Sequence, residues 1–407
     1  MLRLVASILI GAAGACLAQA FTIPLYHVRD EQGNLRLGVY AALGGSRDAR
    51  LYELDTGSSG MYAAYNAAWW PQLAVVRPSP GPQDYGSGVQ FDADIVKTQI
   101  AFRLGDGSFS MPATVEIGRI QSGAAKGISS SRWASMVARG QPPLHGVFFG
   151  NMGSGLKEKN GLFAVLAQIP GATNGFIIRS GGVVEQLGRG QSIRRGEVVV
   201  GLTPASRAQF PVRVPMLPQI VDGSPLQLPS GYAARDEYPL AVQITLTGPD
   251  GNTASAKARA VLDTGGVNIH IHPGSGMDVD LEIPRSFLVK DKRLRPDTNV
   301  EITAPGGWNW NFTAGTTKSV NRMQVTPAGD QKAGGINLGI SVFFDFDVMF
   351  DIENGVIGFR PITSGSSGEA VGNQALQSRE PRANDRRETR RDRRRVRREL
   401  EQGGGWQ

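Results

Sequence analysis

A four-residue sequence that occurs twice in this chain limits its possible folds more than any other feature. Leu54-Asp55-Thr56-Gly57 recurs as Leu262-Asp263-Thr264-Gly265. Each copy is followed, after a long stretch, by three residues that end in glycine, Phe148-Phe149-Gly150 in the first half and Asn337-Leu338-Gly339 in the second. Self-similarity on this scale indicates one structural unit used twice. One aspartate at the same point of each unit predicts two carboxylates that face each other across a pseudo-two-fold axis.

The remainder of the chain has the pattern of short strands. Apolar and other residues alternate over residues 35–41 and 95–104, and glycine-containing turns follow both segments. Of the 407 residues, 53 are glycine and 24 are proline, a composition that favours turns over long helices. Further strands are expected at residues 198–200, 242–246 and 258–262. Helical periodicity is weak outside residues 63–73 and the tail, so we predict an all-β chain.

The first 20 residues have the pattern of a secretory signal peptide. Met1-Leu2-Arg3 is basic, residues 4–17 are apolar, and Ala18-Gln19-Ala20 is a small-residue ending that suits cleavage. Lipid attachment at Cys16 is the alternative. No other run approaches the roughly 20 apolar residues that a membrane-spanning helix needs. We therefore expect an exported protein with no transmembrane span, located in the periplasm, in the cell envelope or outside the cell.

The single cysteine and the arginine-rich end narrow the possibilities further. Because Cys16 is the only cysteine, the mature chain would have no disulfide and no thiolate metal site. Residues 371–407 hold eleven arginines and six acidic residues, which account for most of the net charge of +7. This tail is either a solvated extension or an attachment to an anionic envelope surface. Nucleic acid is not an expected partner, because the tail has no aromatic residue before Trp406.

The folded body is expected to form two lobes, because it is too long for one hydrophobic core. The stretch 364–368 reads Ser-Gly-Ser-Ser-Gly, which is typical of a flexible linker. We expect a monomer. The expected organisation is a signal peptide at 1–20, an N-terminal β lobe at 21–205, a C-terminal β lobe at 206–362, and a linker with the arginine-rich tail at 363–407.

Two facing carboxylates have a definite chemistry. At a separation of about 3 Å they cannot both ionise at low cost, so they share one proton. The ionised member can act as general base toward a bridging water, while the protonated member hydrogen-bonds the scissile carbonyl. The glycine after each Asp-Thr pair lets backbone N–H groups approach the carboxylates. The pattern predicts amide hydrolysis without a metal, a histidine or a covalent intermediate, and no cofactor is expected.

Over about residues 21–361, the sequence resembles the pepsin-like aspartic proteases. Asp55–Tyr62 is similar to the first active-site loop of that family, and Tyr85-Gly86-Ser87-Gly88 is similar to its flap. Residues 144–150 resemble the strand and glycine behind the first loop, and residues 338–359 resemble the C-terminal signature. The resemblance implies an all-β, bilobal fold of two related β-barrel lobes with an active-site cleft between them.

The resemblance also implies an activity and roles for particular residues. Asp55 and Asp263 would be the catalytic pair of an aspartic endopeptidase, and a polypeptide held in extended form would be its substrate. The tyrosine of the flap would close over the bound substrate. The implied substrate-binding residues are Tyr85, Gly86, Gly57, Ser58 and Gly265.

Several positions depart from the family pattern. Gly266 stands where the family usually has a hydroxyl residue, so we expect the Asp263 side to be less well held. Tyr62 stands where tryptophan is usual, and Asn337 replaces an apolar residue behind the second loop, where a buried amide needs a partner. Asp55 follows the expected leader too closely to leave room for a basic prosegment. The lack of disulfides favours a bacterial envelope source.

Other interpretations are open at the level of sequence. The two aspartates would cap tight turns in a purely structural interpretation, and a catalytically silent protein would use the same cleft to bind a peptide or protein. Tyr85 would then be an ordinary hairpin tyrosine. His270 and His272 lie on one face of a strand, where a structural role is favoured over a zinc site. A structural envelope protein anchored by its tail is a third hypothesis.

Overall fold

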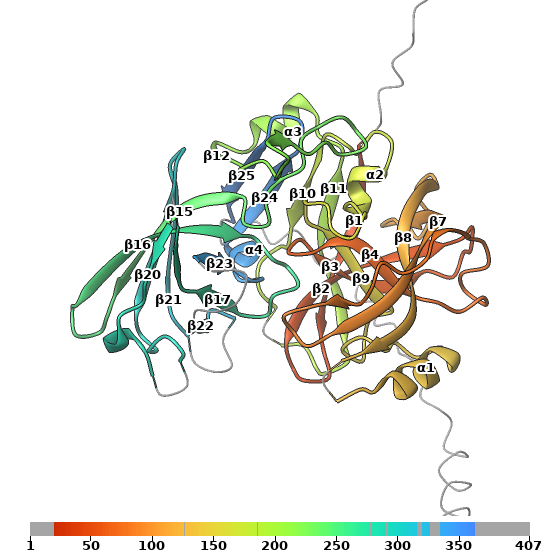
Figure 1. Ribbon diagram of the computed structural model, residues 1–407, viewed down its shortest axis with the longest axis horizontal. Coiled ribbons are helices and arrows are strands. Elements are labelled where there is room, and N and C mark those ends of the chain that lie inside the picture. The colour runs from red at the N-terminus through yellow and green to blue at the C-terminus, as the bar shows by residue number, and fades with distance from the viewer. Residues whose placement is uncertain are drawn as a thin grey trace, which may run out of the picture. The chain divides into compact units, whose positions relative to one another are not determined.

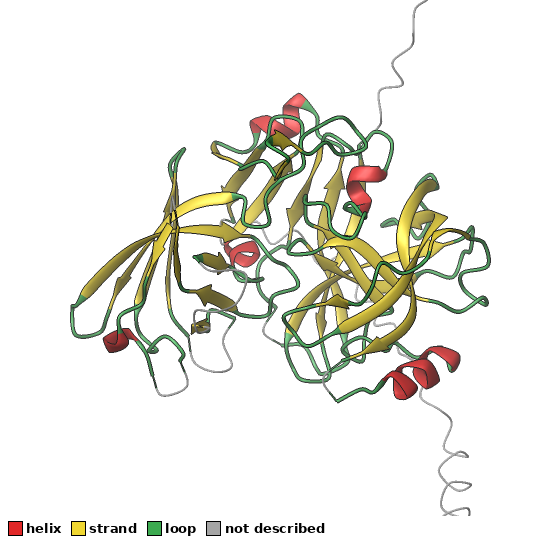
Figure 2. Ribbon diagram, viewed as in Figure 1, coloured by secondary structure: helices red, strands yellow, loops and turns green. Residues whose placement is uncertain are grey.

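The computed structural model describes residues 20–362, apart from 126, 185, 277–278, 290–291, 316–319 and 326–333. The expected leader with Cys16, except for Ala20, and the expected linker and tail at 363–407 therefore lie outside the described residues. Strands dominate the described part, and the few helices are short (Figure 2). The prediction of an all-β chain is confirmed.

The larger of two main sheets has 14 strands and is built mostly from the first half of the chain. Burial alternates along strands that have one face on the core, as in β7 (Gln90–Phe102), whose buried residues are apolar apart from Thr98. In spatial order its strands are β12 (Val212–Pro215), β25 (Val356–Pro361), β24 (Phe346–Asp351), β10 (Gly175–Arg179), β11 (Ser192–Val200), β1 (Phe21–Arg29), β2 (Leu35–Leu43), β3 (Arg50–Asp55), β9 (Gly150–Ser154), β4 (Ser59–Ala64), β8 (Ala113–Ala124), β7 (Gln90–Phe102) and β5 (Ala74–Arg77), with β6 (Gln83–Asp84) paired to β7.

The second sheet has nine strands, all from the second half. In spatial order they are β21 (Trp308–Thr313), β20 (Asn299–Ala304), β15 (Leu240–Thr247), β16 (Thr253–Val261), β23 (Gly335–Asn337), β17 (Ile269–His272) and β22 (Met323–Val325), with β19 (Val279–Leu281) joining β18 (Gly274–Gly276) to β16. The other elements are the hairpin of β13 (Ile220–Val221) and β14 (Ser224–Pro225), the helices α1 (Ser130–Ala138), α2 (Val165–Gln168), α3 (Pro204–Ala208) and α4 (Val342–Asp345), and a 3₁₀ turn at Arg285–Phe287. The strands expected at 198–200 and 242–246 are confirmed within β11 and β15, and the strand expected at 258–262 is the end of β16, which stops one residue earlier at Val261.

The two halves repeat one pattern of strand pairing. In the first half, β3 runs parallel to β9, β9 antiparallel to β4, and β4 parallel to β8. In the second half, β16 runs parallel to β23, β23 antiparallel to β17, and β17 parallel to β22. Each Asp-Thr-Gly sequence stands where the first strand of its set ends, with Asp55 the last residue of β3 and Asp263 two residues after β16. The duplication expected from the repeated sequence is therefore present in the topology.

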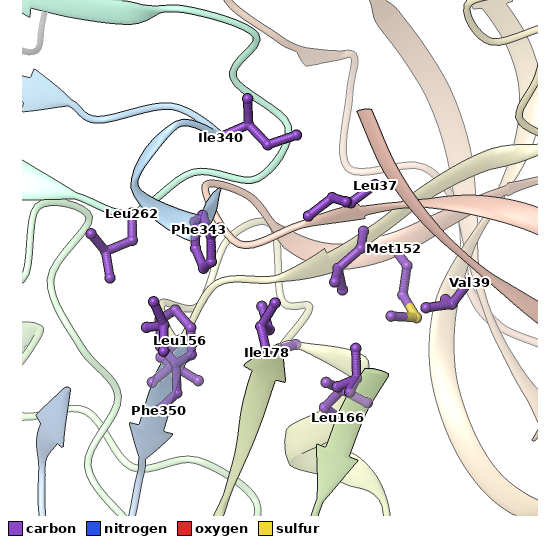
Figure 3. Close-up of a cluster of buried hydrophobic side chains, with 14 of the residues drawn as sticks. Leu37, Val39, Met152, Leu156, Leu166, Ile178, Leu262, Ile340, Phe343 and Phe350 are labelled. Carbon is purple, nitrogen blue, oxygen red and sulfur yellow. The ribbon is translucent and has the colours of Figure 1, made fainter. Parts of the chain in front are cut away.

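The end of the described chain joins the larger sheet. Strands β24 and β25 (blue in Figure 1) pair with each other, and β24 pairs with β10 of the first half. One hydrophobic cluster includes buried residues of both halves. Figure 3 shows part of it, where Leu37 and Met152 from the first half belong to the same cluster as Leu262 and Phe350. The turns that carry Asp55 and Asp263 are anchored on this cluster through Leu54 and Leu262.

Two segments differ from the expectation for helices. Residues 63–73 are not helical, because Ala63 and Ala64 end β4 between two neighbouring strands and turns follow. The helix α1 was not expected from the sequence. Its first turn is capped by the side chain of Ser129, and it buries Trp133 and Val137, which lie one turn apart on the same face.

Candidate active site

The first Asp-Thr-Gly sequence forms a turn between β3 and β4. Asp55 is the last residue of β3 and is 6% exposed. The chain reverses through Gly57 and Ser58, which points two backbone N–H groups back at the carboxylate. Oδ1 of Asp55 accepts hydrogen bonds from the N–H of Gly57 at 2.9 Å and of Ser58 at 3.1 Å. Such backbone donors stabilise an ionised carboxylate.

Two side chains hold the other oxygen of Asp55. Its Oδ2 accepts hydrogen bonds from Oγ of Ser58 at 2.7 Å and from Nδ2 of Asn151 at 2.6 Å. Asn151 lies in β9, which runs between β3 and β4 directly behind the turn. This asparagine was not identified from the sequence. The signal that could have found it is an Asn-x-Gly sequence present in both halves, at 151–153 and 337–339.

The strand register corrects the expected extent of the repeat. Glu53 pairs with Asn151 in the first half, and Val261 pairs with Asn337 in the second. Glu53 and Val261 each precede an aspartate by two residues, so Asn151 and Asn337 are equivalent. The counterpart of Asn337-Leu338-Gly339 is therefore residues 151–153, and the match to Phe148-Phe149-Gly150 was wrong.

Close packing explains why the glycine falls at this point of each unit. A Cβ on Gly153 would lie 2.3 Å from the carbonyl oxygen of Gly60, and a Cβ on Gly339 would lie 2.4 Å from that of Asn268. Both distances are shorter than any real contact, so only glycine fits behind each turn. Phe148, in contrast, is fully buried in the core before β9 begins.

The second Asp-Thr-Gly sequence forms a matching turn after β16. Oδ1 of Asp263 accepts hydrogen bonds from the N–H of Gly265 at 2.8 Å and of Gly266 at 3.0 Å. Oδ2 accepts a hydrogen bond from Nδ2 of Asn337. Asp263 lacks a hydroxyl donor, as the sequence indicated, but the amide of Asn337 supplies a donor to the same oxygen. Asn337 is only partly buried, and the partner of its amide is the carboxylate itself.

The two turns are joined by reciprocal hydrogen bonds of their threonines. Oγ1 of Thr56 donates to the carbonyl of Leu262 at 2.6 Å, and Oγ1 of Thr264 donates to the carbonyl of Leu54 at 2.6 Å. Each hydroxyl also accepts from the N–H of the opposite threonine, at 3.0 and 3.1 Å. Both threonines are buried. This symmetrical set of four bonds fixes one turn against the other.

Replacing Thr264 by valine is expected to lower the free energy of unfolding by about 2–4 kcal/mol. The shape of the side chain is kept, but the carbonyl of Leu54 and the N–H of Thr56 lose their partners in a buried place. Chemical denaturation compares this variant with Thr313→Val, whose exposed hydroxyl bonds only Asn299. Equal losses in the two variants would contradict a structural role for the threonine pair.

Asp55 and Asp263 meet between the two turns. Their carboxyl groups lie within hydrogen-bonding reach of each other. A Cβ on Gly57 would come within 2.2 Å of Cγ of Asp263, and a Cβ on Gly265 within 2.7 Å of Cγ of Asp55. Desolvation, with the nearby charge of Asp55, raises the pKa of Asp263 to about 7. The pair can therefore hold one proton between them over the acid range.

Replacing Asp263 by asparagine is expected to change stability in a way that depends on pH. In the wild type, the pKa of Asp263 rises from 3.8 to about 7 on folding, so folding keeps a proton that the unfolded chain releases. The wild type therefore loses stability as the pH rises from about 4 to 7. Because asparagine does not titrate, the free energy of unfolding of the variant, relative to wild type, should rise by on the order of 2–4 kcal/mol over this range. Denaturation curves across the range measure this difference, and a constant value would contradict the raised pKa.

The predicted flap is a hairpin formed by β6 and β7. The N–H of Tyr85 donates to the carbonyl of Val89 at 2.9 Å, which closes the turn. The Tyr85 ring packs edge-on against Phe91, and its buried hydroxyl lies near Asp55. Desolvation and then the charge of Asp55 raise the pKa of Tyr85 well above its usual value. Gly86 is exposed at the tip, where an added Cβ would meet no atom within 4 Å.

Of the predicted site residues, the structure brings Asp55, Asp263, Gly57, Ser58, Gly265 and Tyr85 together, while Gly86 lies at the exposed tip of the hairpin. The ring of Tyr62 packs against Phe91 with centroids 6.0 Å apart, and burial raises the pKa of its hydroxyl to about 12. The roles of these residues in catalysis and substrate binding stay predictions.

A buried group of charged residues lies behind the first turn. Nε of Arg36 donates to Asp30 at 2.8 Å, and its Nη1 donates to Glu53. Burial raises the pKa of Glu53 to about 7, against the opposing effect of Arg36 and with a further increase from Asp55. Nη1 of Arg36 also lies 3.4 Å from the carbonyl oxygen of Gly265, so the group reaches the second turn. Nothing in the sequence pattern pointed to this cluster.

Among the described residues, no group of three or more histidine, cysteine or acidic side chains is arranged to hold a metal ion. His270 and His272 stack with ring centroids 6.4 Å apart on β17. No helix in this part of the chain is both long and apolar enough to span a bilayer.

Comparison with known proteins gives a structural likeness only. No protein-family model matches the sequence, and no curated protein matches it. Among solved structures, the chain is similar to an aspartic proteinase from Irpex lacteus, with a TM-score of 0.54 and 14% identity. The match covers 86% of this chain and 100% of that one. At this level of identity the likeness concerns the fold alone, and the chain has a bilobal, pepsin-like β fold.

Proposed function

We propose that this chain is an exported aspartic endopeptidase that hydrolyses peptide bonds with a water activated by Asp55 and Asp263. The observation that carries the proposal is the meeting of two carboxyl groups within hydrogen-bonding reach, each at the same point of a duplicated turn. Turns that only needed a capping aspartate would not require the two carboxylates to be held together at a cost in electrostatic energy.

The different hydrogen bonding of the two carboxyls supports different roles for them in the proposed reaction. Asp55 accepts four hydrogen bonds and Asp263 accepts three, so the negative charge is better stabilised on Asp55. Asp55 then takes a proton from the water, whose oxygen attacks the carbonyl carbon of the substrate. Asp263 gives its proton to the carbonyl oxygen, which yields a neutral tetrahedral intermediate. Asp55 then gives its proton to the amide nitrogen while Asp263 takes a proton from one hydroxyl of the intermediate. The C–N bond breaks, the carboxylic acid and the amine are released, and the pair returns to its starting protonation state.

The hairpin of β6 and β7 suits a substrate in extended form. A strand-like peptide could hydrogen-bond to the backbone of this hairpin on one side and to the two turns on the other. The predicted leader at residues 1–20 is the basis for proposing export. A catalytically silent protein that binds a peptide in the same place is the second candidate, and it is favoured by the missing hydroxyl at Gly266.

Cleavage of an unfolded protein substrate tests the proposal. The full chain is incubated with the substrate at a series of pH values from about 3 to 8, and the peptides are identified by mass spectrometry. Cleavage at acid pH, inhibited by a statine-type transition-state mimic and lost as the pH rises through about 7, is expected, because the pair then loses its shared proton. Binding of the mimic without cleavage at any pH would favour the silent binding protein.

A further inference from the structure

Asn151 and Asn337 occupy equivalent positions behind the two turns. Asn151 pairs with Glu53, and Asn337 pairs with Val261. Each of these partners precedes the aspartate of its half by two residues. Each donates from Nδ2 to Oδ2 of the aspartate in its own half. An amide in this place was unexpected, since a residue behind a tight turn in a β core is ordinarily apolar. The duplication of the contact indicates that it serves the carboxylates and not local packing.

The orientation of the Asn337 amide is fixed by a second bond. Its Oδ1 accepts a hydrogen bond from the N–H of Gly339 at 2.9 Å, so Nδ2 has to face Asp263. Asn151 is 4% exposed, and its Oδ1 faces the hydroxyl of Ser58 at 3.5 Å. Both amides therefore present a donor to the carboxylate. A donor in this place favours the ionised form of the acid and lowers its pKa.

The two halves differ in one donor. In the first half, Oδ2 of Asp55 accepts from the hydroxyl of Ser58 as well as from Asn151. The position equivalent to Ser58 in the second half is Gly266, so Asn337 is the side-chain donor to Asp263 among the described residues. Loss of the asparagine should therefore matter more for Asp263 than for Asp55.

We propose that Asn151 and Asn337 are positioning residues that hold Oδ2 of each carboxyl and set the pH range in which the pair keeps one proton. The proposal rests on the proposed function. Asn337 stabilises the charge that Asp263 acquires when the last proton leaves, and so limits activity at high pH. Asn151 stabilises the charge of Asp55 in the singly protonated pair, and so limits protonation at low pH. The macroscopic pKa values belong to the pair, so each asparagine affects mainly one of them.

The pH profile of kcat/KM for three variants tests the proposal. In Asn337→Ala, the pH at which kcat/KM falls on the basic side of the profile is expected to be about one unit higher than in wild type. The reason is that the ionised form of Asp263 loses a charge-assisted hydrogen bond. In Asn151→Ala, the pH at which kcat/KM falls on the acid side is expected to rise as well. This shift should be smaller than the shift in Asn337→Ala, because Ser58 still donates to Asp55. Asn309→Ala is the matched control. Its amide also donates to a carboxylate, Glu301 at 2.9 Å, but on the exposed face of β21, and its profile should equal that of wild type.

A rescue variant separates positioning from packing. In the double variant Asn337→Ala/Gly266→Ser, the new hydroxyl would take the place that Ser58 has in the first half. A Cβ on Gly266 would lie 3.0 Å from Oδ2 of Asp263, 3.1 Å from Oδ1 of Asn337 and 3.2 Å from Cα of Gly339, and the alanine removes the second of these close contacts. The double variant should therefore return the basic limb toward its wild-type position. A cavity effect alone would not be reversed by a hydroxyl at another residue.

A measurement without turnover distinguishes failure of this proposal from failure of the proposed function. Carboxyl carbons of ¹³C-labelled aspartate are titrated by NMR in wild type and in each variant. Shifts of about one pH unit in the titration of the pair in Asn337→Ala would support the asparagine role, even if no protein cleaves peptides. Unchanged titrations and unchanged profiles in both Asn337→Ala and Asn151→Ala would overturn it. The two variants act on different carboxyls, so a folding failure in one leaves the other as a test.

Discussion

Asp55→Asn is expected to reduce peptide hydrolysis by about 10⁴-fold or more. The amide that replaces the carboxylate cannot take a proton from water, so the attacking hydroxide is not generated. Among the described residues no other base stands in the same relation to Asp263, since Glu53 is buried against Arg36 behind the turn. Cleavage of a fluorogenic peptide at the optimum pH of the wild type measures the loss.

The fold of Asp55→Asn should be retained. Asparagine has nearly the same volume as aspartate, and its carbonyl oxygen can still accept from the N–H groups of Gly57 and Ser58. Removal of one carboxylate also removes repulsion from the pair. Thermal unfolding is the control. If Asp55→Asn does not fold, the same cleavage measurement is made on Asp263→Asn. Hydrolysis by folded Asp55→Asn at a rate near that of wild type would disprove the proposed mechanism.

Arg36→Ala is expected to lower the free energy of unfolding by about 3–5 kcal/mol. Arg36 donates to Asp30 and to Glu53, and all three side chains are nearly inaccessible to solvent. Without the guanidinium, two acidic groups remain buried without their cation. Chemical denaturation at neutral pH measures the loss. At lower pH the loss should become smaller, because protonation of Glu53, whose pKa is raised to about 7, removes one of the uncompensated charges.

Arg295→Ala is the control for this prediction. Arg295 pairs with Asp250 at 3.4 Å, and the two side chains are 34% and 45% exposed. Exposed pairs of this kind contribute about 0–1 kcal/mol. A loss of similar size in Arg36→Ala and Arg295→Ala would show that the buried cluster does not stabilise the turns.

The local sequence was enough to predict the pair of aspartates and the class of fold. Asp-Thr-Gly appears twice, and the geometry of the turn follows from the three residues themselves, because glycine allows the N–H groups to approach Asp55 and Asp263. Alternating apolar residues predicted strands such as β2, where Leu35, Leu37 and Val39 are buried. These features depend on near neighbours in the chain.

The features that sequence reasoning missed depend on residues far apart in the chain. Asn151 reaches Asp55 only because β9 pairs in parallel with β3, and the register of that pairing cannot be read from either strand alone. Arg36 would pass for a surface residue on an alternating strand, yet it is buried by Asp30 and Glu53. The hydroxyl missing at Gly266 suggested a weakly held Asp263, and the compensating donor at Asn337 comes from another strand.

Hydrolysis in ¹⁸O-labelled water is the most direct measurement of the central claim. If Asp55 and Asp263 activate a water that attacks the peptide carbonyl, a single turnover places one ¹⁸O in each new carboxyl group, and no substrate fragment becomes bonded to the protein. Mass spectrometry of the products and of the intact chain detects both. A covalent adduct between protein and substrate, or the absence of cleavage at every pH from about 3 to 8, would contradict the account.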